Sequence, residues 1–292
     1  MFGPARRSWV LGGGGARGAA QVGVIQALFE AGVEAPAAIV GTSVGALNGA
    51  SIAAYPSLAG TMMLREVWLS RHAAAVFEAH PLGVIVSGLR RNLRSVMPQQ
   101  NVRNLITRAQ ALTGVTTFEE LRIPLAVVAT DMNAGKPAVF RSGELSPALL
   151  ASTAIPGVFP SVRINDREHL DGGVVENTPL DIAVDDGARD VMAISLMAGG
   201  EFEQAPASLP ELIARTLQLS LHHQMLNDYE RLRERARIVV LCPITAPTAT
   251  WVMKRAHVES VMDSARNATA ELLKQRGSRL FRHSGIHYIA LG

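Results

Sequence analysis

A serine at the centre of residues 41–45, Gly-Thr-Ser-Val-Gly, is the side chain best placed for covalent chemistry. The motif follows a short apolar run, and small, helix-compatible residues follow it at 46–55. A strand, a one-residue corner and a helix together make a serine project from the edge of a sheet. Side chains at Gly41 and Gly45 would collide with a neighbouring strand or helix at such a corner. We therefore expect Ser43 to be a nucleophile at the amino terminus of a helix.

A second glycine-rich segment occupies residues 12–18, between an apolar run at 8–11 and a helical pattern. Glycine is needed where several consecutive N–H groups turn toward one anion. The segment matches the dinucleotide fingerprint formally, but the second strand lacks the acidic residue that this fingerprint requires at its end. The other functional interpretation is an oxyanion hole for the charge that develops when Ser43 attacks a carbonyl. Adjacent parallel strands would bring both loops to one sheet edge, and a purely structural turn remains the third interpretation.

Ser43 needs a group that accepts its proton, because a serine hydroxyl is otherwise a weak nucleophile. Asp171 ends a hairpin across an Asn-Asp turn, and Gly172 and Gly173 after it permit a close approach to a neighbouring loop. An aspartate with an ordinary pKa of about 4 is a weak base, but a low-dielectric cleft would raise that pKa. From the residues alone, Lys136 remains an alternative base, and a plain turn role for Asp171 remains open.

These three motifs, in this order, resemble those of the patatin-like phospholipase family. The resemblance extends to the segments at 130–131, 151–160 and 171–179 and covers roughly residues 8–200. It implies a Ser-Asp dyad in which Ser43 attacks an ester carbonyl and Asp171 acts as the base. The supporting motif residues would be Arg17, Gly18, Gly41, Gly45, Gly172 and Gly173.

The resemblance also implies an oxyanion hole made by the amides of Gly13, Gly14 and Gly15. The expected activity is that of a metal-independent acyl hydrolase with no cofactor. It would act on phospholipids, lysophospholipids or other lipid esters through an acyl-serine intermediate. A general carboxylesterase without lipid preference and a non-catalytic lipid- or nucleotide-binding protein remain the rival interpretations. The head group, the acyl position and the chain length stay open.

Composition limits the class of protein. Of the 292 residues, 48% are hydrophobic and 18% are charged, which is typical of a folded globular chain. The formal net charge of +3 is too small for the dense basic footprint of a nucleic-acid binder. A single cysteine, Cys242, excludes an internal disulfide and a multi-cysteine metal site. Because no signal peptide or membrane-spanning run is evident, we expect a cytoplasmic protein that contacts membrane surfaces peripherally.

Strand and helix patterns alternate along the chain, which favours one α/β domain over residues 1–292 with a mostly parallel sheet flanked by helices. By resemblance, this is the patatin-like three-layer architecture, with a helical C-terminal part from about residue 205. Expected strands lie at 8–11, 38–40, 124–131, 138–140, 162–164, 168–170, 190–196 and 237–241, and expected helices at 20–32, 46–55, 209–235 and 257–277.

Residues 61–108 have a looser helical pattern. An apolar stripe there includes Met62, Met63, Val67 and Trp68, and arginines follow at 90, 91, 94 and 103. The pattern fits an amphipathic cap over a lipid site, and it fits equally a core-facing helix with a solvated arginine face.

Overall fold

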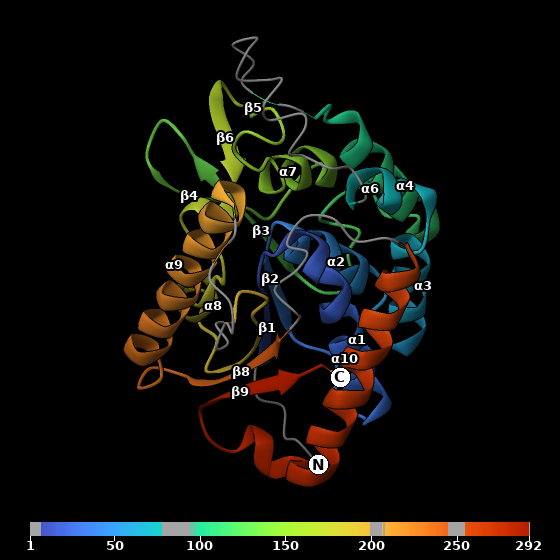
Figure 1. The fold of residues 1–292 in the computed structure, drawn as a ribbon, viewed down its shortest axis with the longest axis vertical. Coiled ribbons are helices and arrows are strands. Elements are labelled where there is room, and N and C mark those ends of the chain that lie inside the picture. The colour runs from blue at the N-terminus through green and yellow to red at the C-terminus, as the bar shows by residue number, and fades with distance from the viewer. Residues whose placement is uncertain are drawn as a thin grey trace.

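The computed structural model of the chain describes residues 7–77, 95, 97–198, 206, 208–244 and 255–291. In this part of the chain nine strands form one sheet in the order β5-β6-β3-β2-β1-β7-β8-β9, and β4 pairs with β3 (Figure 1). The parallel strands are β1 (Arg7–Leu11), β2 (Ala38–Thr42), β3 (Leu125–Asp131), β7 (Asp190–Ile194), β8 (Arg237–Ile244) and β9 (Gly285–Ala290). The antiparallel strands are β4 (Lys136–Phe140), β5 (Val162–Ile164) and β6 (Arg167–Asp171).

Helices cover both faces of the sheet, because successive side chains of each buried strand point to opposite faces. Trp9 and Leu11 of β1 pack into one hydrophobic cluster, and Val10 between them packs into the other. The helices packed in the first cluster are α1 (Gly18–Glu30), α2 (Val44–Ala54), α3 (Leu58–Trp68), α4 (Arg71–Phe77), α6 (Gln100–Thr113), α7 (Leu145–Ser152) and α10 (Arg255–Arg276). The second cluster contains α8 (Leu180–Asp185) and α9 (Leu209–Leu232). The expected α/β sheet between two helical layers is confirmed (Figure 1).

The strands that the sequence predicts are present, with ends shifted by a few residues. The hairpin turn is the predicted one, since Asn165 and Asp166 both have the positive φ that a tight two-residue turn requires, 48° and 60°. Beyond residue 205 the chain forms not only the expected helices and β8 but also β9, which the sequence analysis did not predict. Cys242 of β8 is buried.

The core-facing interpretation of residues 61–108 holds for α3, because Val67 and Trp68 are buried in the first cluster. Met62 points away from that cluster and is 49% exposed. The arginines at 90, 91 and 94 lie outside the described residues. Within the described ranges, no helix combines the length and the apolarity needed to cross a bilayer.

Candidate active site

Ser43 lies at the sharp corner between β2 and α2. Its φ of 56° and ψ of −127° are a backbone conformation that residues with a side chain rarely adopt. The flanking glycines allow this corner: a Cβ on Gly41 would lie 2.7 Å from the Gly45 carbonyl oxygen, and a Cβ on Gly45 would overlap the Leu11 carbonyl. The corner is fixed further by the Ser43 N–H, which donates a hydrogen bond of 2.8 Å to the hydroxyl of Ser152.

The hydroxyl of Ser43 donates a hydrogen bond to the carboxylate of Asp171, with an Oγ–Oδ2 distance of 2.6 Å. The two residues are 128 positions apart in the sequence, and both side chains are buried. The partner that the sequence analysis expected for Ser43 is therefore the one in contact with it. Lys136, the alternative, is an exposed residue at the start of β4.

Asp171 is held at the end of β6 by its backbone and by a short 3-10 helix, η2 (Gly172–Val174). Its N–H donates to the Ala154 carbonyl at 2.9 Å, and its carbonyl accepts from the Thr130 hydroxyl at 2.8 Å. The Gly173 N–H donates to the second carboxylate oxygen at 2.8 Å. Burial raises the pKa of Asp171 to about 6, although the hydrogen bonds from Ser43 and Gly173 act in the opposite direction. A carboxylate with this pKa is a stronger base than an exposed one.

The glycine-rich loop after β1 lies directly against Ser43. A Cβ on Gly13 would come within 3.1 Å of the Ser43 Cβ and 2.6 Å of the Asn177 side-chain oxygen. The N–H of Gly13 donates to the Asn177 carbonyl at 3.0 Å, so the expectation that this amide serves an oxyanion needs correction. Across the described ranges, the N–H groups of Gly14 and Gly15 have no acceptor. Because Gly13 has no side chain, the loop can approach Ser43 closely. The amides of Gly14 and Gly15 are free to bind an anion.

Arg17 and α9 form a contact that the sequence analysis missed. Arg17 is buried, and its guanidinium donates to neutral acceptors, the Leu196 carbonyl at 3.3 Å and the Gln218 side chain at 3.0 Å. Gln218 in turn donates to the Ala198 carbonyl at 3.0 Å. Burial lowers the pKa of Arg17 to about 10. No local pattern could reveal this pairing, because 201 positions separate Arg17 from Gln218.

Further supports of the site were also not assigned from the sequence. The hydroxyl of Thr42, next to Ser43, donates a hydrogen bond to the Glu176 carbonyl at 2.8 Å. Gln224 of α9 donates to the Val175 carbonyl at 2.6 Å, just beyond η2. The segment that carries Asp171 is therefore tied both to the residue before Ser43 and to α9.

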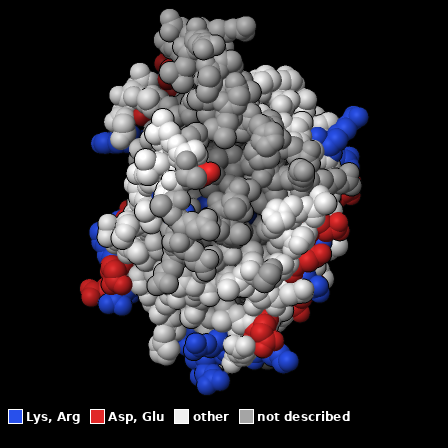
Figure 2. Space-filling model, in the orientation of Figure 1, with Lys and Arg blue, Asp and Glu red and all other residues white. Residues whose placement is uncertain are grey.

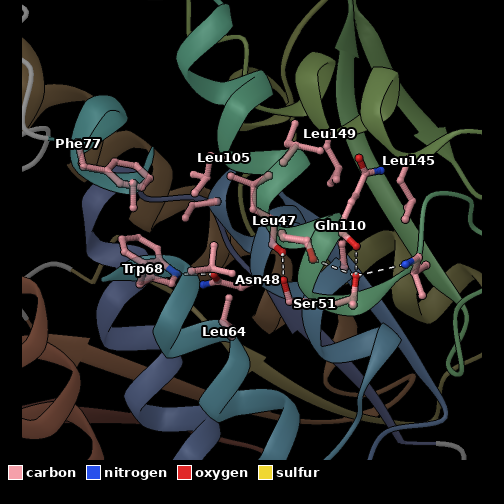
Figure 3. A pocket seen from close by; sticks show the side chains of 18 residues that line it. Leu47, Asn48, Ser51, Leu64, Trp68, Phe77, Leu105, Gln110, Leu145 and Leu149 are labelled. Carbon is pink, nitrogen blue, oxygen red and sulfur yellow. Dashed lines mark hydrogen bonds between the residues drawn. The ribbon is translucent and has the colours of Figure 1, made fainter. Parts of the chain in front are cut away.

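A pocket lies against α2 (Figure 3). Val44, the residue after Ser43, is among its lining residues, and Ser43 and Asp171 are not. Its empty space, including the mouth, is about 570 Å³. Most of its lining is aliphatic or aromatic, with the stacked rings of Trp68 and Phe77 at one end and Gln110 and Leu145 at the other (Figure 3). The full lining is Val44, Leu47, Asn48, Ala50, Ser51, Leu64, Val67, Trp68, Ala73, Phe77, Leu105, Ile106, Ala109, Gln110, Thr113, Val115, Leu145 and Leu149.

The polar groups in this pocket are engaged within the protein. Asn48 accepts from the Trp68 indole at 2.9 Å and donates to the Gln21 side chain at 2.9 Å. The hydroxyl of Ser51 donates to the Leu47 carbonyl at 3.3 Å, and Gln110 accepts from the Ser146 hydroxyl at 3.3 Å. Because these polar groups are already hydrogen-bonded within the protein, an apolar ligand can bind in the pocket without leaving them unpaired.

Comparison with known proteins finds relatives in sequence and solved structures that align with this chain. An uncharacterized NTE family protein of Mycobacterium tuberculosis is 32% identical over 221 residues, which cover 73% of this chain and 54% of that protein. Patatin-like phospholipase domain-containing protein 7 of Mus musculus is 34% identical over 194 residues, 64% of this chain and 13% of that protein. The chain spans about half the length of the curated mycobacterial relatives that it matches.

The crystal structure of VipD from Legionella pneumophila aligns with 93% of this chain and 67% of that one, with a TM-score of 0.49 and 15% identity. The family model of the patatin-like phospholipases matches residues 9–184, a range that contains the glycine-rich loop, the Ser43 corner and Asp171. This match spans more than half of the chain and includes each of the three motifs. The chain belongs to the patatin-like phospholipase family.

Proposed function

We propose that this protein is a serine lipid acyl hydrolase of the phospholipase A or lysophospholipase type, working through a Ser43–Asp171 dyad. The observation that carries the proposal is the 2.6 Å hydrogen bond from the Ser43 hydroxyl to a buried carboxylate. A nucleophile within hydrogen-bond reach of a base is the arrangement that covalent acyl transfer requires. Family membership supports the same chemistry.

In the proposed first step Ser43 Oγ bonds to the ester carbonyl carbon while its proton passes to Asp171. The negative charge that develops on the carbonyl oxygen is stabilised by the free amides of Gly14 and Gly15 and by the positive end of α2. The alcohol leaves with the proton from Asp171, and the acyl group stays on Ser43. In the second step Asp171 takes a proton from water, and the oxygen of that water bonds to the acyl carbon. The bond between the acyl carbon and Ser43 Oγ then breaks, Asp171 returns the proton to Oγ, and the fatty acid leaves.

The pocket along α2 favours a substrate whose acyl group is a long lipid chain over one whose acyl group is short. Its lining is largely apolar and includes Val44, the residue after Ser43, and an apolar lining is typical of sites that bind apolar ligands. A general carboxylesterase would not require so long an apolar lining. The proposed substrates are therefore phospholipids, lysophospholipids or related lipid esters.

The proposal is tested by treating the protein with a fluorophosphonate serine probe and measuring its intact mass. We expect one adduct on the wild type and none on Ser43→Ala, with hydrolysis of phospholipid and short-chain ester lost in the same variant. The hydrogen bond to Asp171 gives Ser43 its reactivity, so an unactivated serine elsewhere should not be labelled. An adduct that persists in Ser43→Ala, or turnover by that variant, would refute the assignment.

Ala109→Leu tests whether the pocket holds the acyl chain. Ala109 lines the pocket from α6, and three added carbons should exclude the distal part of a long chain. We expect kcat/KM for a long-chain ester to fall about tenfold relative to a short-chain ester, since a pocket methylene discriminates by about 1–3 kcal/mol. Ala111→Leu is the matched control, because Ala111 is exposed on the same helix. Equal losses for both chain lengths would place the acyl chain elsewhere.

A further inference from the structure

The N-terminal half of α9 exposes a row of aliphatic side chains. The exposed fractions are 69% for Leu209, 50% for Leu212, 59% for Ile213, 43% for Leu217 and 39% for Leu219. At 100° per residue, these positions span an arc on the side of the helix away from the buried Gln218. Glu211 and Arg215, which alternate with them along the chain, lie outside that arc. Within the described ranges, this helix half has five of the ten exposed large hydrophobic residues. We call these five residues the α9 apolar face.

The same helix is hydrogen-bonded to both loops of the candidate active site. Gln218 accepts from Arg17 of the glycine-rich loop at 3.0 Å, and Gln224 donates to Val175 at 2.6 Å, four residues after Asp171. Val174, beside that contact, is itself an exposed apolar residue. The helix that carries the α9 apolar face is thus hydrogen-bonded to both loops.

The charged residues of α9 lie outside the arc of its apolar face in the N-terminal half, which contains Glu211 and Arg215. The C-terminal half of α9 forms ion pairs, such as Arg231 with Asp228 and Arg235 beyond the helix with Asp185 of α8. Figure 2 shows charged side chains gathered over the lower end of α9. A helix with an entirely solvated role would carry charge along its whole outer face. The α9 apolar face therefore suits contact with an apolar surface rather than with water.

The size of the α9 apolar face argues against a second copy of this chain as the occupant. Five partly exposed aliphatic side chains present roughly 400 Å² of apolar surface, comparable with the largest patch on an ordinary monomer. A stable dimer needs about 800 Å² from each partner. A lipid surface has no such requirement, because each inserted side chain is transferred separately into the acyl boundary.

We propose that the α9 apolar face docks on a lipid surface, with Leu209, Leu212, Ile213, Leu217 and Leu219 inserted at the boundary between head groups and acyl chains. The proposal rests on the proposed function, since it names the surface from which the substrate reaches Ser43. Because the face carries no charge, docking is driven by apolar insertion and is largely insensitive to salt. The rigid contacts of Gln218 and Gln224 keep the docked helix and both loops in one orientation.

The test compares two double variants that change the same kind of residue at the same helical spacing. Leu209→Glu with Ile213→Glu alters the α9 apolar face, and Leu58→Glu with Met62→Glu alters exposed residues of α3, which are 40% and 49% exposed in the wild type. Both pairs are spaced i, i+4 from the first helical residue. Vesicles of phosphatidylcholine are the probe, and sedimentation measures binding at low and high salt.

We expect the wild type and the α3 variant to bind vesicles equally at both salt concentrations, and the α9 variant to bind at least tenfold more weakly. Hydrolysis of vesicle lipid should fall with binding. Turnover of a soluble short-chain ester and labelling of Ser43 should stay within twofold in the α9 variant. If Ser43 is not labelled in any form but vesicle binding still depends on α9, the docking surface stands and the proposed function fails.

Three results would overturn the proposal. The first is vesicle binding by the α9 variant that equals that of the wild type. The second is a wild type that light scattering shows to be a dimer and an α9 variant that is a monomer, which would assign the face to a second copy. The third is a parallel loss of soluble-ester turnover, which would mean that the substitutions act on the site itself.

Discussion

Asp171→Asn is expected to lower kcat for ester hydrolysis by about 10²–10⁴-fold, the range that general-base catalysis contributes. The carboxylate accepts a hydrogen bond from the Ser43 hydroxyl, with an Oγ–Oδ2 distance of 2.6 Å. An amide of the same shape cannot take the proton from that hydroxyl. KM should change little, because Asp171 does not line the pocket along α2. The measurement is kcat on a soluble ester together with the rate of fluorophosphonate labelling. A variant with full activity would transfer the role of base to another residue.

The same substitution should stabilise the fold above pH 6. The pKa of Asp171 is raised to about 6 in the folded state by burial, and an unfolded aspartate ionises at about 3.9. The folded state therefore binds this proton more tightly, and its stability falls as pH rises from about 4 to 6. The asparagine side chain cannot ionise, so the variant should gain up to about 3 kcal/mol over the wild type at pH 8. Denaturant unfolding at pH 4 and pH 8 measures the difference.

The wild-type activity should show the corresponding acid limb. Since Asp171 must be ionised to act as the base, kcat/KM is expected to rise with pH through about 6 and then to level off. An activity that is constant from pH 5 to pH 8 would contradict this assignment.

Asp190→Asn is the matched control, because Asp190 is also a buried aspartate of the sheet, at the opposite end of the parallel strands. Burial alone would raise the pKa of Asp190, but hydrogen bonds from Arg237 and Arg7 outweigh it and hold the pKa below its ordinary value. Loss of this carboxylate should destabilise the fold by about 3 kcal/mol and leave kcat unchanged, because the charges of two arginines lose their partner. The two variants are thus expected to change stability in opposite directions.

Local sequence patterns predicted much of the candidate site because each of its loops is formed by neighbouring residues. The corner at Ser43 needs a strand, two glycines and a helix, all within a dozen positions, and the structure has that order. The glycine-rich loop and the Ser43 corner were expected at one sheet edge, and β1 and β2 are indeed adjacent and parallel. The turn at Asn165 and Asp166 is equally local.

The parts that could not be predicted depend on contacts between distant residues or on weak patterns. β9 was missed because it pairs only with β8 and, as an edge strand, buries only Ile289, so it lacks an apolar run. The use of the Gly13 amide depends on the Asn177 carbonyl, 164 positions later. The resemblance to the family implied three oxyanion donors, and within the described residues the amides of Gly14 and Gly15 are the two of these without an acceptor. The contact between Gln218 and Arg17 could not be predicted for the same reason, since 201 positions separate the two residues.

Gly45→Ala is expected to cost the fold about 3 kcal/mol or more and to abolish activity with it. A Cβ at this position would overlap the Leu11 carbonyl and lie 2.7 Å from the Gly12 carbonyl oxygen. Both groups are backbone, and the Gly12 N–H is itself bonded to the Ile194 carbonyl at 3.0 Å, so neither can move without displacing β1 or the glycine-rich loop. The first turn of α2 would have to shift, and Ser43 would move with it. Denaturant unfolding and fluorophosphonate labelling measure the two losses.

Gly49→Ala, one turn later on α2, separates this steric effect from the change in helix propensity. The nearest atoms to its added Cβ are the side-chain carbons of Ile39 and Leu125, at 3.1 and 3.3 Å, which can give way by small rotations. Alanine also favours a helix interior over glycine by about 1 kcal/mol. We therefore expect Gly49→Ala to keep wild-type labelling and a stability within about 1 kcal/mol of the wild type. If both variants lost labelling equally, α2 as a whole would be intolerant of substitution, and the close approach of Gly45 to β1 would not be the feature that positions the nucleophile.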